Sequence, residues 1–303
     1  MTNHSTLTLP IVVAIDGSPV SEEAVRWAAD EAARRGTTLH VVHAFTYAHA
    51  PGGYVGTYDP DAPARVSEAM CQRAVASAQD AHPDLAVTTE VRVGRAAPEL
   101  VKASDHAAMM VLGSRGHGRL TGVIVGSVSQ QVATHAHCPV VVVREKDEKA
   151  ATSVVVGVDG SPAAAQALLF AAEHAAASGA SVRAIRSEYV EIPVGAPDGN
   201  WYGALVEHVA RATEEARRTV EEVAAELPDV DIELRVVREH PETALVEASA
   251  EVEMLVVASR GLGGFAGLML GSVSQGVLSR AKVTVAVVPA GVEVEHPDTP
   301  HAG

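Results

Sequence analysis

The stretch that decides the fold is residues 11–19, Ile-Val-Val-Ala-Ile-Asp-Gly-Ser-Pro, which returns at residues 154–162 as Val-Val-Val-Gly-Val-Asp-Gly-Ser-Pro. A second landmark, Gly-Ser-Val-Ser-Gln, begins at Gly126 and again at Gly271. The offset between the copies is 143 residues at the aspartates and 145 residues at the second landmark. Two landmarks that recur in the same order at a nearly constant offset predict two copies of one domain.

Length and composition agree with two domains. The chain has 303 residues, of which 47% are apolar and only 3% aromatic, so the cores must be built from Ala, Val and Leu. Such a composition is typical of helices packed closely on a parallel sheet. We expect one domain over residues 1–148 and a second over residues 149–303, with a disordered acidic tail from about residue 291.

Charge and cysteine content restrict the function classes. With 38 acidic and 23 basic residues the net charge is −15, which disfavours a protein that follows a phosphate backbone, so no nucleic-acid partner is expected. The only cysteines are Cys71 and Cys138, too few for a disulfide framework, and Cys71 is predicted to be a buried small hydrophobe. Residues 1–10 lack the pattern of a signal peptide, and no apolar run is long enough to span a membrane. The expected location is the cytoplasm.

Hydrophobic periodicity predicts an alternation of strands and helices in each copy. Ser18 is a candidate N-cap, Pro19 suits the first helical position, and Gly36 ends that helix. The other elements expected in copy one are strands at 11–15, 38–45, 87–93, 109–112 and 139–143, with helices at 64–81, 98–106 and 127–135. Those named for copy two are strands at 154–158, 181–187, 232–237, 254–257 and 283–288, with helices at 163–177, 204–227 and 243–250. The predicted fold class is therefore α/β: two Rossmann-like, doubly wound domains, each with about five parallel strands and helices on both faces.

The segment after the fourth strand of copy one has the features of a phosphate-binding site. Gly113 and Gly116 precede a Gly-Ser pair at residues 126–127, where a helix is expected to begin. Glycines permit close backbone approach, and a helix N-terminus offers amide groups and a positive dipole end to an anion. Serine hydroxyls can donate to phosphate oxygens, and Arg115 adds positive charge unless its side chain points to solvent. The candidate phosphate ligands are Gly113, Arg115, Gly116, Gly118, Gly126, Ser127, Val128 and Ser129.

The glycine spacing matches neither a P-loop nor the dinucleotide-binding Gly-x-Gly-x-x-Gly. The spacing closely resembles the nucleotide-binding motif of the ATP-binding universal stress proteins: Gly113 and Gly116 are separated by two residues, and nine residues separate Gly116 from Gly126-Ser127. The resemblance extends over both copies. It implies that ATP is the ligand, with any Mg²⁺ or Mn²⁺ held through the phosphates. It also implies that Asp16 contacts the nucleoside, that Ala14 lines the same cleft, that Ala44 lies beside the adenine, and that Leu112 belongs to the loop around ribose and phosphates.

The resemblance carries over to copy two with two departures. Ala258 replaces the first glycine of the motif, which would strain the loop if a positive φ were needed there. Ser187 stands where copy one has Ala44, which places a polar group near the expected base. The candidate ligand-binding residues of copy two are Gly157, Asp159, Ser187, Val257, Ala258, Arg260, Gly261, Gly263, Gly271, Ser272, Val273 and Ser274.

Other interpretations of these residues stay open. Asp16 and Asp159 could act only as helix caps. The cluster His135, His137 and Cys138 could suggest a metal, but no second cluster supplies the remaining ligands, so no metal site is expected. No catalytic residue is identified either, because no nucleophile, base or metal-binding carboxylate pair is apparent.

The expected function is that of an ATP-binding stress-response module, with one nucleotide per domain, little or no catalysis and an unidentified protein partner. A slow ATP hydrolase or nucleotidyl-transfer enzyme on the same fold is an alternative, and a nucleotide-free interaction module is another. The resemblance also implies that the apolar closing strands pair domains, either within the chain or in a homodimer.

Overall fold

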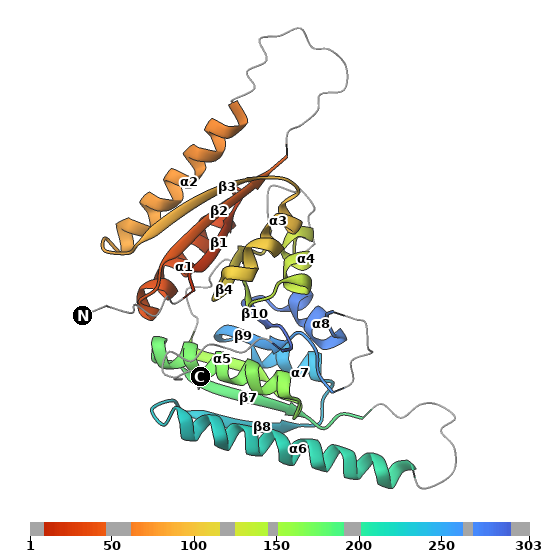
Figure 1. The fold of residues 1–303 in the computed structure, drawn as a ribbon. Coiled ribbons are helices and arrows are strands. Elements are labelled where there is room, and N and C mark those ends of the chain that lie inside the picture. The colour runs from red at the N-terminus through yellow and green to blue at the C-terminus, as the bar shows by residue number, and fades with distance from the viewer. Residues whose placement is uncertain are drawn as a thin grey trace, which may run out of the picture. The chain divides into compact units, whose positions relative to one another are not determined.

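A computed structural model describes residues 9–46, 62–115, 125–144, 151–190, 201–262 and 269–291 (Figure 1). The chain divides into two compact units, whose described parts are residues 9–144 and 151–291. The predicted domain boundary between residues 148 and 149 and almost all of the predicted tail lie outside the described residues. None of the helices in the described ranges is both long and apolar enough to cross a membrane.

Unit 1 is built on a parallel sheet. Its strand order is β3-β2-β1-β4-β5, and the strands pair in register, for example with Val13 opposite both Val41 and Val111. The side chains of β4 and β5 are almost entirely buried, as expected for a sheet covered on both faces. The strands of this unit are β1 (Ile11–Ile15), β2 (Leu39–Phe45), β3 (Val87–Val93), β4 (Met109–Gly113) and β5 (Val140–Val143).

The helices of unit 1 begin and end where the sequence signals place them. Ser18 caps the first helix by accepting a hydrogen bond from the Ser21 amide, Pro19 occupies the first turn, and Gly36 ends the helix with φ at +62°. A left-handed terminal residue of this kind is accessible mainly to glycine. The helices are α1 (Pro19–Arg35), α2 (Ala62–Ala81), α3 (Ala96–Ala103) and α4 (Ser127–His135), with a 3₁₀ turn η1 at Ser104–His106.

Unit 2 repeats this plan with the strand order β8-β7-β6-β9-β10. Ser161, Pro162 and Gly179 bound its first helix in the same roles, and Gly179 has φ at +74°. Its strands are β6 (Ala151–Gly157), β7 (Ser181–Ser187), β8 (Ile232–Val237), β9 (Val252–Ala258) and β10 (Thr284–Val288). Its helices are α5 (Pro162–Ser178), α6 (Trp201–Glu226), α7 (Pro241–Ala248) and α8 (Ser272–Arg280).

The direction of winding reverses inside each sheet. In unit 1, α1 and α2 pack together on one face, while α3 and α4 pack together on the other (Figure 1). The chain therefore runs outward from β1 to β3 and then returns across β1 to β4. In doubly wound sheets such a reversal leaves a crevice at the carboxyl ends of the strands, where ligands bind. The doubly wound fold class predicted from the sequence is confirmed.

Several predicted bounds need correction. The predicted strand at 154–158 begins three residues earlier, at Ala151, and ends at Gly157. The predicted helix at 98–106 is an α-helix over Ala96–Ala103 that tightens into η1. The helix α8 was not among the elements named for copy two, although its Gly-Ser-Val-Ser-Gln start repeats that of α4.

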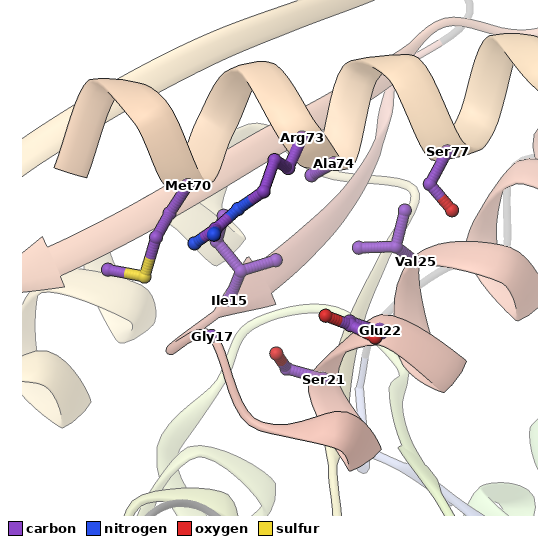
Figure 2. Close-up of a pocket in the computed structure, with 9 residues that line it drawn as sticks. All are labelled: Ile15, Gly17, Ser21, Glu22, Val25, Met70, Arg73, Ala74 and Ser77. Carbon is purple, nitrogen blue, oxygen red and sulfur yellow. The ribbon is translucent and has the colours of Figure 1, made fainter. Parts of the chain in front are cut away.

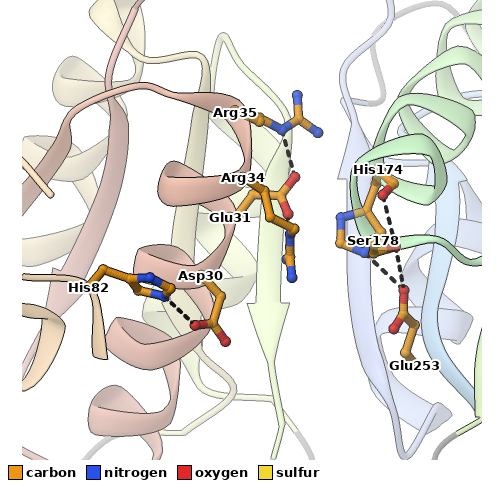
Figure 3. Close-up of polar contacts among 8 residues, drawn as sticks. All are labelled: Asp30, Glu31, Arg34, Arg35, His82, His174, Ser178 and Glu253. Carbon is orange, nitrogen blue, oxygen red and sulfur yellow. Dashed lines mark hydrogen bonds and ion pairs between the residues drawn. The ribbon is translucent and has the colours of Figure 1, made fainter. Parts of the chain in front are cut away.

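Matching positions of α1 and α5 carry different buried polar groups (Figure 3). Glu31 of α1 is fully buried and pairs with Arg34 at 2.7 Å and Arg35 at 2.6 Å on the same helix. The corresponding residue of α5 is His174, which is also buried and contacts Glu253 of β9 at 3.1 Å. Each buried ionisable group therefore has a polar partner, as burial requires, although the pairs come from different elements.

Both cysteines are free and buried, which confirms the prediction for Cys71. Burial raises the pKa of the Cys138 thiol to about 12, and burial likewise raises the pKa of Cys71. We expect neither to react with iodoacetamide at pH 8 in the folded protein, because only about one Cys138 thiol in 10⁴ would be the reactive thiolate. Mass spectrometry of native and urea-unfolded samples would check this, and full labelling of the native protein within minutes would contradict it.

Candidate functional site

A cleft of about 530 Å³ opens at the carboxyl ends of β1, β2 and β4 in unit 1. Its walls come from the turn after β1, from α3 and from the first turn of α4, which is the crevice that the reversal of winding predicts. Ten residues that the sequence singled out line this one cleft: Ala14, Asp16, Ala44, Leu112, Gly113, Arg115, Gly126, Ser127, Val128 and Ser129. Gly116 and Gly118 of unit 1 lie outside the described residues.

Asp16 is held by the turn between β1 and α1. Its Oδ1 accepts a hydrogen bond from the Ser18 amide at 2.9 Å, and Ser18 rather than Asp16 is the helix cap. The capping alternative is therefore wrong for Asp16, although the turn fixes the direction of its carboxylate. Asp159 is held in the same way by the Ser161 amide at 2.9 Å, and Ser161 caps α5.

The start of α4 is an open helix N-terminus. Gly126 is the N-cap residue, and as a glycine it has no side chain with which to cap the helix. The Gly126 amide donates to the Ser114 carbonyl at 2.7 Å, which ties the helix start to the end of β4. The amides of the first turn carry partial positive charge and face the cleft, so the site favours an anion.

Two glycines of the motif have different reasons to be glycine. A Cβ on Gly113 would lie 3.0 Å from the Val20 carbonyl carbon of α1, so α1 would have to shift to accept a side chain there. A Cβ on Gly126 would meet nothing closer than 3.6 Å, and its φ of −74° suits any residue. Packing therefore does not require glycine at position 126, whereas a ligand that approaches the backbone would.

The two serines of α4 also differ. Ser129 is buried, and its hydroxyl donates to the Gly113 carbonyl at 2.8 Å. The expectation that Ser129 donates to phosphate therefore needs correction, because a hydroxyl has one proton and this one is already used. Ser127 is exposed and makes no side-chain hydrogen bond with a described residue, so its hydroxyl is available. In unit 2, Ser274 repeats the bond of Ser129 by donating to the Ala258 carbonyl at 2.6 Å.

Two arginines of unit 1 follow the neighbouring strands β4 and β5. Arg115 lines the cleft, while Arg144, which follows β5 directly, is buried. Burial, and then the like charge of Arg115, lower the pKa of the Arg144 guanidinium to about 10. Arg144 therefore stays charged at neutral pH. Sequence reasoning missed Arg144 because it lies beyond the motif, and unit 2 has Pro289 at the matching position.

Several other lining residues were not predicted. Ala96 and Leu100 of α3 form an apolar wall, and Val42 of β2 adds to it. The helical spacing of positions 96 and 100 was a usable signal, because it places both on one face of α3. That this face turns toward the cleft follows only from the packing. The remaining lining residues are Ile15, Ser21, Val125 and Gln130.

In unit 2 the matching residues also gather at the carboxyl ends of the strands. A Cβ on Gly157 would lie 3.1 Å from the Leu245 side chain of α7, so α7 approaches closely where unit 1 has Ala14. Ser187 donates to the Glu239 carbonyl at 2.6 Å, which uses the hydroxyl proton. Ala258 ends β9, and no described residue other than glycine has a positive φ, so the expected strain does not arise. The other predicted residues of unit 2 lie at the end of β9, after it, and at the start of α8, as their counterparts do around β4 and α4: Val257, Arg260, Gly271, Ser272 and Val273. Gly263 lies outside the described residues.

The loop after β9 is fastened to Asp159. The Leu262 amide donates to Asp159 Oδ2 at 2.7 Å, so the backbone of residues 261–262 lies against the carboxylate. Asp159 also acts on its neighbour Arg186: burial lowers the pKa of that guanidinium, while the charges of Asp159 and Glu188 oppose the shift. A ligand that uses Oδ2 of Asp159 must displace or share the bond from the loop.

Replacing Gly261 with alanine is expected to open this loop. The added Cβ would clash with Asp159 Oδ2, so the hydrogen bond from the Leu262 amide cannot form in its present place. We expect the Leu262 amide to exchange with deuterium at least tenfold faster in Gly261→Ala, corresponding to the loss of about one hydrogen bond. Gly271→Ala is the control, since its Cβ would meet nothing closer than 3.5 Å. Equal exchange in both variants would contradict the prediction.

Among the described residues, no group of three or more His, Cys, Asp and Glu side chains could hold a metal ion. Of the cluster considered from the sequence, the His137 Nδ1 contacts Asp105 at 2.5 Å, and Cys138 is buried. Asp16 is the only carboxylate among the described residues that line the cleft.

Comparison with known proteins identifies this arrangement. The model of the universal stress protein family matches residues 9–144 and again residues 151–289. The chain belongs to the universal stress protein family. A universal stress protein of Mycobacterium tuberculosis is 33% identical over 305 residues, covering 93% of this chain and 96% of its own length. One of Mycolicibacterium smegmatis is 35% identical over 294 residues, covering 92% and 96%.

A solved structure supports the fold. The crystal structure of a universal stress protein from Archaeoglobus fulgidus covers 93% of this chain and 98% of its own chain, with a TM-score of 0.66 and 20% identity. At that identity the match shows the fold alone. The suspected tandem universal stress protein is thus confirmed as a tandem of two such domains.

Proposed function

We propose that this universal stress protein binds adenine nucleotide, with ATP as the expected ligand, in the cleft of unit 1 and at the matching place in unit 2. The cleft of about 530 Å³ falls within the range of about 300–1,000 Å³ typical of small-molecule sites. The observation that carries the proposal is the uncapped N-terminus of α4 beside Gly126, a glycine that the packing does not require.

The cleft offers a separate environment for each part of a nucleotide. Ala44, Val42 and Leu100 provide an apolar wall for the base, and Asp16 stands at the nucleoside position. The amides of α4, the Ser127 hydroxyl and the Arg115 guanidinium suit the phosphates. A Mg²⁺ or Mn²⁺ ion would be held chiefly through the phosphates, because the described lining residues provide no carboxylate pair for it.

Occupancy of the site, rather than turnover, is the proposed output. A nucleotide that bridges α4 and Asp16 would favour one conformation of the loop between β4 and α4 and so alter the surface shown to a partner. Hydrolysis would need a positioned general base, and Asp16, the one carboxylate among the described lining residues, accepts a hydrogen bond from the Ser18 amide. Location in the cytoplasm, association as a homodimer and an unidentified protein partner remain parts of this proposal.

The first test is the nucleotide content of freshly purified protein, measured by anion-exchange chromatography of the denatured supernatant. About two ATP per chain would support both sites, and one would leave unit 2 empty. Mostly ADP would favour the alternative of a slow hydrolase. The absence of nucleotide, followed by no uptake of Mg-ATP, would overturn the proposal in favour of an interaction module.

Asp16 variants separate ligand contact from local folding. Asp16→Asn keeps an oxygen for the Ser18 amide but removes the charge, whereas Asp16→Ala removes both. We expect about a tenfold loss of ATP affinity in unit 1 for Asp16→Asn and about a hundredfold loss for Asp16→Ala, as is typical for hydrogen bonds to charged groups. Calorimetric titration would measure this, with the exposed, ion-paired Glu23→Gln as control. Unchanged affinity in both Asp16 variants would remove Asp16 from the site.

A further inference from the structure

A second, smaller pocket lies between α1 and α2 of unit 1, on the face of the sheet opposite to α3 and α4 (Figure 2). Its volume is about 220 Å³, less than half of the 530 Å³ of the cleft at the strand ends. It is therefore too small for a nucleotide but large enough for a single metabolite of amino-acid size. We call it the α1/α2 pocket.

The α1/α2 pocket is apolar at its base and charged at its mouth. Ile15, Val25 and Ala74 are buried and form the base. Arg73 of α2 and Glu22 of α1 are exposed and stand on opposite walls (Figure 2). A ligand that fits this arrangement has an apolar body and a head that carries both charges.

The two opposite charges at the mouth do not pair with each other. Arg73 makes no hydrogen bond or ion pair with a described residue, so its guanidinium donors are available. Glu22 likewise makes no hydrogen bond or ion pair within the described ranges, and its charge acts on Arg26, whose pKa is raised by the Glu23 hydrogen bond and to a smaller degree by Glu22. Unpaired opposite charges across one small pocket favour a ligand that bridges them.

Unit 2 shows that this arrangement is particular to unit 1. Arg218 of α6 occupies the position that matches Arg73, with the offset of 145 residues that relates the ends of the two helices. Its guanidinium is neutralised by Glu215 at 3.3 Å. The residue that matches Glu215 is Met70, which removes the partner of Arg73 and adds a flexible apolar wall to the pocket.

Two further matching positions differ in the same sense. The residue in unit 2 that corresponds to Val25 is Leu168, which is larger and fully buried. The residue that corresponds to Glu22 is Ala165, so the acidic wall is missing there. Unit 1 therefore differs from unit 2 at three pocket positions. Val25 leaves more space at the base than leucine would, Glu22 adds a carboxylate, and Met70 replaces the glutamate that pairs with the arginine in unit 2.

We propose that the α1/α2 pocket is a second ligand site, which binds a free α-amino acid with an apolar side chain. The carboxylate of the amino acid would pair with Arg73, its ammonium group with Glu22, and its side chain would enter the base beside Val25 and Ala74. The Ser77 hydroxyl, which makes no bond with a described residue, adds a donor on the Arg73 wall. Neither Arg73 nor Glu22 lines the nucleotide cleft, although Ile15 and Ser21 line both pockets. The proposed site therefore has charged groups of its own.

The test is a calorimetric titration of the full chain with leucine and methionine, in parallel with two truncated analogues of leucine. 3-Methylbutylamine lacks the carboxylate, and 4-methylpentanoate lacks the ammonium group. We expect leucine or methionine to bind one per chain, and each analogue of leucine to bind at least tenfold more weakly, because each loses one charged hydrogen-bonding group. No heat from either amino acid up to about 10 mM would overturn the proposal. Equal binding of leucine and 4-methylpentanoate would also overturn it.

Variants locate the site. Arg73→Ala and Glu22→Gln should each weaken amino-acid binding at least tenfold. Arg218→Ala is the matched control, because the same residue type is removed from the equivalent helix position, and it should leave binding unchanged. Equal losses in Arg73→Ala and Arg218→Ala would exclude the α1/α2 pocket. ATP titration of the same variants keeps the two proposals apart, since Arg73→Ala should bind ATP as the unaltered chain does.

Discussion

Replacing Gly160 with alanine is expected to lower the free energy of unfolding of unit 2 by about 4 kcal/mol. Gly160 has φ at +85°, a conformation that costs other residues about 1–2 kcal/mol. Its added Cβ would also lie 2.7 Å from the Ala212 carbonyl oxygen of α6, which belongs to the backbone and cannot rotate away. Overpacking of this kind costs about 1–3 kcal/mol more. Calorimetry of the full chain should show the transition of unit 2 lowered by roughly 10 °C.

Gly179→Ala is the matched control for this substitution. Gly179 has φ at +74°, but a Cβ there would meet nothing within 4 Å. It should therefore cost only the conformational part, about 1–2 kcal/mol. If Gly160→Ala and Gly179→Ala destabilised the protein equally, close packing of α6 on the turn after β6 would be ruled out as the larger cause.

Gly113→Ala is the second substitution expected to have a large effect. The methyl group would lie 3.0–3.2 Å from backbone atoms of Val20 and Ser21, so α1 and β4 would have to move apart. We expect a loss of about 1–3 kcal/mol in the stability of unit 1. Because Gly113 also lines the cleft, ATP affinity in unit 1 should fall together with stability. Chemical denaturation and calorimetric titration measure the two effects.

Unit 2 supplies the control for Gly113, because alanine already stands at the matching position 258. Ala258→Gly should lower the stability of unit 2 by only about 0.5–1 kcal/mol, the usual cost of glycine in a strand. If Gly113→Ala left the stability of unit 1 unchanged, α1 would be able to shift at Val20 at no cost. The glycine of the motif would then be kept for the ligand alone.

The fold could be predicted largely from the sequence because its signals are local. The β-branched run at 11–15 followed by Ser18, Pro19 and Gly36 specifies a buried strand and the limits of one helix, and each signal acts over a few residues. The same signals recur in copy two, so the second domain is predicted in the same way. The early start of β6 at Ala151 escaped prediction because residues 151–153, Ala-Thr-Ser, carry little apolar pattern and are brought into the strand by pairing.

Much of the candidate site could also be predicted, because parallel strands bring their carboxyl ends to one edge. Asp16, Gly113 and Gly126 are far apart in sequence, yet the strand order places them around one cleft. Ser129 shows the limit of such reasoning. Its motif position suggested a phosphate donor, whereas the closeness of the Gly113 carbonyl directs its proton into the fold.

Residue order alone predicts the two copies of an α/β domain, the bounds of most helices and strands, and the loop in which the glycines gather. These properties follow from short-range preferences and from periodicity. The tertiary contacts alone reveal that a Cβ would crowd α1 at Gly113 but not at Gly126, that the Leu262 amide donates to Asp159, and that Arg73 has no ion-pair partner among the described residues. Each of these depends on the distance between atoms of different elements, which close packing sets and residue type alone does not.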